Sequence, residues 1–341
     1  MLAQLGCGTV VRRCSGLALV VVLFAGCGGS PAPPTQPSTS TGTLSQVAKA
    51  YLDEIISTMQ TYSLYRHNSD WTAFRTSVYT AAGSAQAVSD TYPAIRVAYG
   101  LLGDIHGRYT SPSGTSVSGG TSLNCSDSSP ASATLPAGIQ LVKVPQCVYL
   151  PSTPEAVQFA QQIQDAIRTG DADATVGWIV DLRNNLGGDT YPMIAGIGPI
   201  LGEGIWGYFT GPDGKNDAYG YRAGSSFWSN DVETTVTNPY SLRQPNPKVA
   251  VLLNTVTASA GESVAIGSVG RPNTRSFGNP TCGYTTGVST YSLSDGAKVG
   301  LATSVMADRT GHTYGRQVVP DETIADSAAT LQRAIEWLQG K

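Results

Sequence analysis

The sequence has few charged residues and no concentration of them. Only 13% of its 341 residues are Asp, Glu, Lys or Arg, and the net charge is −3. Neither a nucleic acid nor an anionic membrane surface is therefore predicted as a partner. Hydrophobic residues make up 41% of the chain, which is enough for one large or two modest domains with a proper core.

Metal-binding patterns are missing as well. The three histidines stand far apart, and the sequence contains neither a Cys-x-x-Cys nor a His-x-x-x-His pair. Zinc sites usually show such spacing, because neighbouring ligands must reach one ion. We therefore expect no metal site and no cofactor.

Long hydrophobic runs are also absent. The apolar run Leu17–Ala25 is too short to cross a bilayer as a permanent helix, and it follows two arginines as in a secretory signal. The run leads into the letters LFAGC, ending at Cys27, which resemble a bacterial lipoprotein box. We expect residues 1–26 to be a signal peptide and Cys27 to carry lipid. The protein would then be an exported cell-envelope lipoprotein that touches the membrane only through this anchor.

The segment after Cys27 is rich in Pro, Ser and Thr, which predicts a solvated tether over residues 27–43. Two of the remaining cysteines, Cys125 and Cys147, bracket a Gly-, Ser- and Pro-rich stretch of an exported chain, and we expect them to form a disulfide. Cys282 is left unpaired, either as a small buried hydrophobe or as part of a functional site.

Hydrophobic spacing divides the rest into two parts. Residues 44–103 predict a bundle of three helices, at Leu44–Met59, Trp71–Ala82 and Pro93–Leu102. In residues 104–341, the strand Ile139–Val144, the helix Pro154–Thr169 and the strand Val176–Leu182 predict a parallel crossover, hence an α/β core.

The later part of the core shows one region without a clear pattern. Residues 202–246 are rich in Gly, Tyr and Trp without a period, and either bind an extended peptide or form a packed cap. Further on, we expect a strand at Arg275–Gly278, a hairpin around Ser294-Asp295-Gly296 and a last helix at Ala328–Leu338.

Ser259 lies where the buried strand Val249–Leu253 gives way to a helical pattern. The free amides and dipole of a helix's first turn stabilise the negative charge that acyl transfer creates, which suits a nucleophile. A serine at such a junction is more often only a helix cap. Two other stretches favour the nucleophile: Gly187 and Gly188 follow a parallel strand and are candidate oxyanion donors, and His106 sits in a glycine-flanked turn as a candidate general base.

Together these stretches resemble the C-terminal processing (tail-specific) serine peptidases. The letters DLRNNLGG from Asp181 to Gly188 resemble that family's D-L-R-x-N-x-G-G signature, and TASAGE from Thr257 to Glu262 resembles its nucleophile motif. The resemblance covers about residues 104–321. It implies a crotonase/ClpP-like spiral of parallel βαβ units, with the helical bundle in front and a small β-rich cap.

Two departures place the chain in one branch of that family. Tyr284 stands where the tail-specific branch has its lysine base, and an unperturbed tyrosine is a poor base at neutral pH. The PDZ insertion is missing too. Both features resemble the branch of the nisin-resistance and tricorn core peptidases, in which an upstream histidine acts as base; the letters LGDIH select His106 here.

The resemblance implies an envelope-anchored serine endopeptidase that acts on peptides or proteins through Ser259 and His106. Gly187 or Gly188 and Ala260 would hold the oxyanion, Glu262 would orient a substrate amine or brace the site, and Tyr284 would line the pocket. No acid that orients His106 can be identified, although Asp308 and Glu322 are candidates. Two alternatives remain: a catalytically weak peptide-binding or immunity lipoprotein on the same fold, and an esterase that uses the same dyad.

Overall fold

The computed structural model describes residues 42–120, 122–127 and 132–341. Residues 42–341 form one compact unit. The expected signal peptide, the lipidation residue Cys27 and nearly all of the tether lie outside the described residues. Within the described part, none of the helices has both the length and the apolar character needed to cross a membrane.

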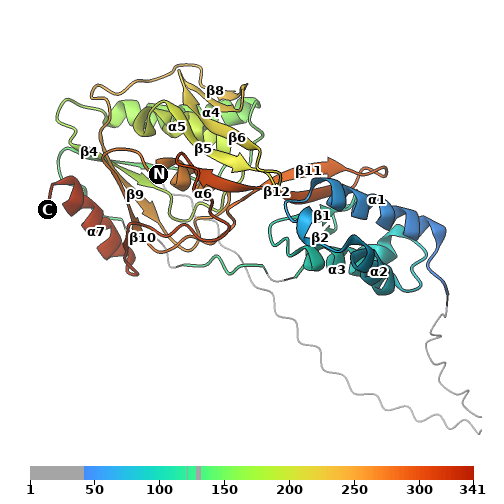
Figure 1. The fold of residues 1–341 in the computed structure, drawn as a ribbon. Helices are drawn as coiled ribbons and strands as arrows, with labels where there is room; N and C mark the ends of the chain where they lie inside the picture. The colour runs from blue at the N-terminus through green and yellow to red at the C-terminus, as the bar shows by residue number, and fades with distance from the viewer. Residues whose placement is uncertain (1–41, 121, 128–131) are drawn as a thin grey trace, which may run out of the picture. The chain divides into compact units, whose positions relative to one another are not determined.

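This unit contains a five-stranded parallel sheet with the strand order β13-β10-β9-β4-β3, of which Figure 1 labels β4, β9 and β10. Its strands are β3 (Ile139–Lys143), β4 (Gly177–Asp181), β9 (Lys248–Leu253), β10 (Thr274–Gly278) and β13 (Glu322–Thr323). The expected crossover is present, because the helix α4 (Pro154–Gly170) connects the parallel neighbours β3 and β4. The predicted α/β class is confirmed.

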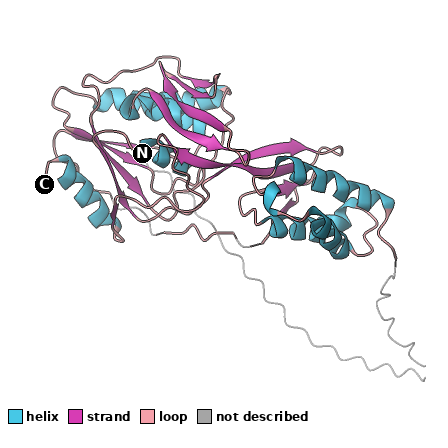
Figure 2. Ribbon diagram, in the orientation of Figure 1, coloured by secondary structure: helices cyan, strands magenta, loops and turns pink. Residues whose placement is uncertain are grey.

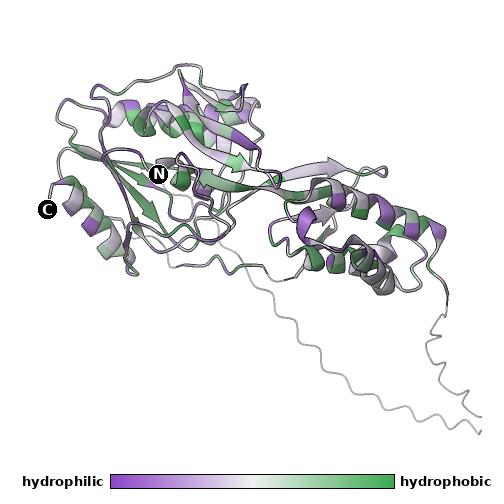
Figure 3. Cartoon of the chain, viewed as in Figure 1, coloured by the Kyte–Doolittle hydropathy of each residue, from purple (hydrophilic) through white to green (hydrophobic). Residues whose placement is uncertain are grey.

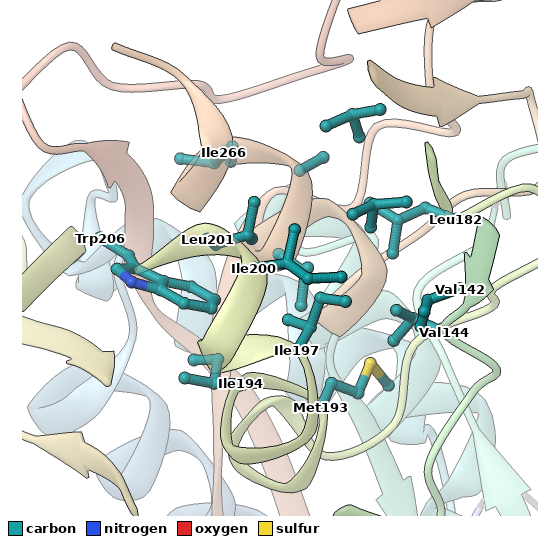
Figure 4. Packing of buried hydrophobic residues seen from close by; sticks show 14 of the residues in the cluster. Val142, Val144, Leu182, Met193, Ile194, Ile197, Ile200, Leu201, Trp206 and Ile266 are labelled. Carbon is teal, nitrogen blue, oxygen red and sulfur yellow. The ribbon is translucent and has the colours of Figure 1, made fainter. Parts of the chain in front are cut away.

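Helices cover both faces of this sheet, so its strands are apolar on both sides. Along β9, Val249, Val251 and Leu253 pack into a cluster with α4, α5 (Thr190–Leu201) and α6 (Ala260–Ser268). Ala250 and Leu252 pack with α7 (Ser327–Leu338) on the other face. Figure 3 shows the apolar colour on these strands, and Figure 4 shows residues of α5 and α6 meeting Trp206 in the larger cluster.

A second, antiparallel sheet has eight strands in the order β2-β1-β12-β5-β6-β7-β8, with β11 paired to β12. Its strands are β1 (Arg108–Thr110), β2 (Ser116–Val117), β5 (Gly204–Thr210), β6 (Asn216–Arg222), β7 (Ser225–Trp228), β8 (Asp231–Thr235), β11 (Thr286–Ser292) and β12 (Lys298–Asp308). Strands β5 to β8 form a cap from the region without a period. Trp206, Tyr219 and Tyr221 are buried in it, so these aromatics belong to a packed cap.

The three expected helices are present as α1 (Gln46–Tyr62), α2 (Trp71–Ala82) and α3 (Tyr92–Leu102), with the short 3-10 turns Arg66–Asn68 and Val88–Thr91 between them. Their buried faces share one cluster with the tip of the β11–β12 hairpin, including Leu293 and Val299. The expected hairpin is therefore confirmed, and its far end is part of the helices' core; Figure 2 shows it reaching from the sheets to the helices.

The expected Cys125–Cys147 disulfide is wrong. Cys125 is bonded to Cys282, with the two Cα atoms 5.3 Å apart, and Cys147 is a buried free thiol. The backbone explains the difference: Cys147 forms a bridge with the glycine turn, donating its N–H to Gly187 at 3.1 Å. That bridge holds Cys147 in the core cluster, away from Cys125.

Candidate active site

Ser259 occupies a strained turn between β9 and α6. Its φ and ψ are 52° and −117°, a conformation that costs a non-glycine residue about 1–3 kcal/mol. Hydrogen bonds on both sides of the residue hold it there: the Ala258 N–H donates to the Asn185 carbonyl at 2.9 Å, and the Ser259 N–H donates to Glu262 Oε2 at 2.7 Å. The Ser259 side chain makes no capping bond with the helix, which leaves its hydroxyl available.

His106 is brought to Ser259 by a turn built around Asp104. The helix α3 ends at Gly103 in the left-handed conformation, and the buried Asp104 carboxylate then accepts from the N–H groups of His106 at 3.0 Å and Gly107 at 2.7 Å. Its second oxygen accepts from Ala302 N–H in β12 at 2.8 Å. The resulting distance between His106 Nε2 and Ser259 Oγ is 3.2 Å, so the predicted nucleophile and base lie within hydrogen-bonding reach.

The residue that orients His106 is Thr286, which the sequence did not single out. Thr286 Oγ1 lies 2.8 Å from His106 Nδ1. The two acids suggested for this role are elsewhere: Asp308 accepts from Thr310 and Tyr314, and Glu322 pairs with arginines. Thr286 precedes the visible alternation of β11, so no sequence signal marked it.

The His106 imidazole is neutral at neutral pH. Burial, together with the positive charge of Arg108, lowers its pKa to about 4, although a hydrogen bond at Thr286 acts in the opposite direction. In the neutral tautomer that donates its Nδ1 proton to Thr286, the lone pair of Nε2 faces the Ser259 hydroxyl. This is the protonation state that a general base requires.

The two glycines of the candidate oxyanion site differ. The Gly187 N–H donates to Asn185 Oδ1 at 2.8 Å and is therefore already paired. Among the described residues, the N–H groups of Gly188 and Ala260 donate to no protein acceptor. Both residues line the cleft that Ser259 faces, so Gly188 and Ala260 are the available oxyanion donors.

Gly188 also shows why this position excludes a side chain. Its φ is +100°, and a Cβ atom there would lie 1.9 Å from the Cys147 carbonyl oxygen. The preceding motif residues serve as structural supports: Arg183 and Asp181 form a buried bidentate ion pair at 2.8 Å.

Glu262 contacts Ser259, and Tyr284 contacts His106. Glu262 is fully buried and accepts from the Ser259 N–H, the Thr281 hydroxyl and the Gly283 N–H. Burial raises its pKa to about 7. Of the two roles suggested for Glu262, bracing the site agrees with this burial, and contact with a substrate does not. The Tyr284 ring packs against His106, with 5.0 Å between the ring centroids, and its hydroxyl accepts from Leu123 N–H at 3.0 Å.

Ser259 opens into a cleft of about 730 Å³ between the parallel sheet, the β11 strand and the cap. Gly188, Ala260 and Thr286 are among the residues that line it with Ser259, and residues of β5 and β8 line it as well. In the described part of the chain, no group of His, Cys, Asp and Glu side chains is arranged to hold a metal ion.

Residues 141–324 match peptidase family S41, which is more than half of the 341-residue chain. The chain belongs to peptidase family S41. It is a serine-type peptidase by family, and the expected resemblance is confirmed. His106 lies outside the matched residues, so this member of S41 takes its candidate base from the segment that precedes the family region.

Individual proteins are similar to this S41 chain over different lengths. The nisin-resistance protein of Lactococcus lactis subsp. lactis is 28% identical over 165 residues, which are 48% of this chain and 50% of that protein. The chain thus spans about half the length of this curated relative.

Solved structures show the same fold over most of the chain. A lipoprotein from Streptococcus agalactiae has a TM-score of 0.65 at 22% identity, covering 88% of this chain and 99% of its own. The photosystem II D1 C-terminal processing protease has a TM-score of 0.54 at 15% identity, with coverages of 86% and 98%. Mature CPAF has a TM-score of 0.51 at 10% identity, with coverages of 86% and 96%.

Proposed function

We propose that this S41 peptidase is an endopeptidase that cleaves peptide bonds through the Ser259–His106 dyad and an acyl-enzyme. The observation that carries the proposal is the 3.2 Å contact between Ser259 Oγ and His106 Nε2, in a cleft where the Gly188 and Ala260 amides are unpaired within the described chain. Nucleophile, base and oxyanion donors are the three parts that acyl transfer requires.

The first half of the reaction acylates the enzyme. His106 Nε2 takes the proton of the Ser259 hydroxyl while Ser259 Oγ bonds to the carbonyl carbon of the scissile peptide. The C–N bond then breaks, and the imidazolium gives its proton to the leaving amine. In the second half, His106 takes a proton from water while the water oxygen bonds to the ester carbon. The bond between that carbon and Ser259 Oγ then breaks, the imidazolium returns its proton to Ser259 Oγ, and the acid leaves.

The negative charge of each tetrahedral intermediate falls on the former carbonyl oxygen. The N–H groups of Gly188 and Ala260 would donate to this oxygen, supported by the positive end of the α6 dipole. Loss of one such donor typically lowers kcat by about 100-fold or more. Thr286 keeps the imidazole oriented throughout, because it holds Nδ1 at 2.8 Å.

The proposed cellular place of this chemistry is the cell envelope, with the protein anchored through lipid on Cys27. The support is the signal-like run and the LFAGC letters. A Cys27→Ser change in the full chain, expressed in a bacterium, should move the protein from the membrane fraction to the soluble fraction. Membrane association that persists in Cys27→Ser would contradict the anchor.

Hydrolysis by purified residues 42–341 tests the catalytic proposal. The substrate is a mixture of unfolded proteins, and new termini are read by mass spectrometry for wild type, Ser259→Ala and His106→Ala. We expect cleavage by wild type alone, with a covalent acyl-enzyme on Ser259 after rapid acid quenching. Cleavage of activated esters but of no peptide would establish the esterase, and peptide binding without acylation would establish the binding lipoprotein.

A further inference from the structure

The cleft contains acidic side chains that no cationic side chain of the described residues neutralises. Four acidic side chains line the cleft, and two of them have cationic partners: Asp213 pairs with Arg66 and His67, and Asp217 pairs with Lys215 at 2.8 Å. The other two are Asp189 and Glu233. Neither has an ion-pair partner among the residues that the structure describes.

These two carboxylates come from different elements that pack against each other, the start of α5 and the strand β8. Asp189 follows the oxyanion donor Gly188 directly and caps α5, using one oxygen to accept from the Tyr191 N–H at 3.0 Å. Glu233 lies in the middle of β8, and its carboxylate accepts no hydrogen bond from the described residues. The cap thus presents Glu233 to the space beside the nucleophile with its hydrogen-bonding capacity unused.

The electrostatics show that the pair lacks a positive charge. Burial raises the pKa of Glu233, and the charge of Asp189 raises it further. Burial also raises the pKa of Asp189, to about 6. A cation between the two would relieve this repulsion and lower the pKa of both carboxyl groups.

The surroundings of the pair suit a cation on an apolar stem. Tyr191 and the partly exposed Trp228 line the same cleft, and aromatic faces attract both alkyl chains and ammonium or guanidinium groups. The carboxylates are not the only reason to expect a ligand in this cleft, because Ser259 and the amides of Gly188 and Ala260 line it too.

We propose that Glu233, assisted by Asp189, is a specificity determinant that selects peptides with a Lys or Arg side chain within three residues of the scissile bond. This inference rests on the proposed peptidase function, since it names the class of substrate for the same site. Carboxylates paired with a cation in a partly enclosed cleft discriminate against neutral and acidic side chains at that position.

Peptide binding to the Ser259→Ala variant tests the preference without relying on catalysis. Fluorescein-labelled, alanine-based octapeptides carry Lys, norleucine or Glu at one position at a time, and Kd is measured by fluorescence anisotropy. We expect the Lys peptide to bind about tenfold more tightly than the norleucine peptide at one position at least, and the Glu peptide to bind weakest. The preference should shrink at high salt, because exposed charge pairs are screened.

Changes at Glu233 assign the preference to the cap. In a Ser259→Ala background, Glu233→Gln should bring the Lys and norleucine peptides to within about twofold of each other, and Glu233→Lys should favour the Glu peptide. Glu155→Gln is the control, because Glu155 is an exposed acid outside the cleft lining whose charge does not act on Glu233. It should keep the Lys preference.

The outcomes separate this inference from the proposed function. Equal binding of the Lys and norleucine peptides at every position, a Lys preference that survives Glu233→Gln, or no measurable binding by any peptide would each overturn the inference. Hydrolysis by the wild type is measured separately with the norleucine peptides and the unfolded-protein mixture. A Lys preference in binding without hydrolysis would leave the selectivity standing and refute the peptidase.

Discussion

The catalytic wall and the cap wall of the cleft treat their polar groups in opposite ways. On the catalytic wall, Asp104 and Glu262 each accept three hydrogen bonds, and Asn185 binds three segments of the backbone. On the cap wall, the Glu233 carboxylate accepts none from the described residues. The groups that support Ser259 and His106 are thus fully hydrogen-bonded without a substrate, whereas Glu233 on the cap lacks a partner within the described chain.

This difference separates rate from selectivity. Hydrogen bonds that are complete before substrate arrives fix Ser259 and His106, so little reorganisation is needed during the reaction. A charge without a partner strengthens the binding only of those substrates that supply the opposite charge. Changes on the catalytic wall should therefore alter the rate for every substrate, and changes on the cap wall should alter the choice among substrates.

The largest expected effect is that of Gly188→Ala. The new Cβ would lie 1.9 Å from the Cys147 carbonyl oxygen, and an alanine rarely adopts the φ of +100° found here. The backbone at residue 188 must therefore shift, and its N–H, the proposed oxyanion donor, shifts with it. We expect kcat/KM to fall about 1,000-fold or more for all peptides. Gly202→Ala is the control, since its φ is +89° but nothing lies within 4 Å of the added Cβ. A Gly188→Ala enzyme within about tenfold of wild type would contradict the assignment of Gly188.

Glu262→Gln should have the next largest effect. The Ser259 N–H and the Gly283 N–H donate to different oxygens of Glu262. In glutamine an NH₂ group replaces one of these oxygens and cannot accept, so one of the two hydrogen bonds around the strained turn is lost. We expect kcat to fall about 100-fold and the free energy of unfolding to fall by about 1–3 kcal/mol. Activity assays and urea unfolding measure the two effects. Unchanged kcat would show that Glu262 does not position Ser259.

The pKa of Glu262 adds a pH signature to the same variant. The folded pKa is raised from 4.5 to about 7, so the group's contribution to stability is fully present below pH 4.5 and is lost as the pH rises through 7. Wild type should therefore lose unfolding free energy across this window, and Glu262→Gln should lose less of it. Parallel pH dependences of the two proteins would contradict the raised pKa.

Thr286→Val should lower kcat by about tenfold, because the imidazole loses the hydroxyl that orients it while keeping its contact with Ser259. Thr286→Ser retains a hydroxyl and should recover most of the activity, with KM unchanged in both variants. This conservative pair separates orientation of the base from packing in β11. Equal activity of Val and Ser variants would show that Thr286 acts through its size alone.

The smallest effect concerns neutral pH, where His106 should show no titration at all. Its pKa is lowered to about 4, so the neutral base predominates above that pH, and kcat/KM should rise through pH 4 and be flat with respect to His106 at higher pH. NMR of the imidazole protons, assigned with His106→Ala, measures the pKa directly. A His106 pKa near 6.5 would contradict the effect of burial.

Local patterns were sufficient to predict most elements of the core. An unbroken apolar run identified β9, because a strand buried on both faces needs apolar residues on both. The cap strands were missed, since the bulge between Ile205 and Gly207 and the buried aromatics on several strands remove the alternation of an ordinary half-exposed sheet.

The sequence predicted those site residues that belong to a motif. It did not predict those whose role depends on contacts between segments far apart in the chain. The positions of Ser259, His106 and the glycine pair followed from motifs. Which glycine keeps a free amide depends on the side chain of Asn185, and the role of Thr286 depends on contact between distant segments. The wrong disulfide has the same origin. Cys147 pairs through its backbone with the glycine turn at Gly188, whereas Cys282 lies where it bonds to Cys125, and both placements depend on contacts between distant segments.

The most direct test of the account is labelling of residues 42–341 with a fluorophosphonate probe. The account predicts that wild type is labelled, Ser259→Ala is silent, His106→Ala is slower by about 100-fold or more, and Tyr284→Phe stays within about threefold of wild type. That result would establish Ser259 as a nucleophile activated by His106. A folded wild type that stays unlabelled, or His106→Ala labelled at the wild-type rate, would contradict it.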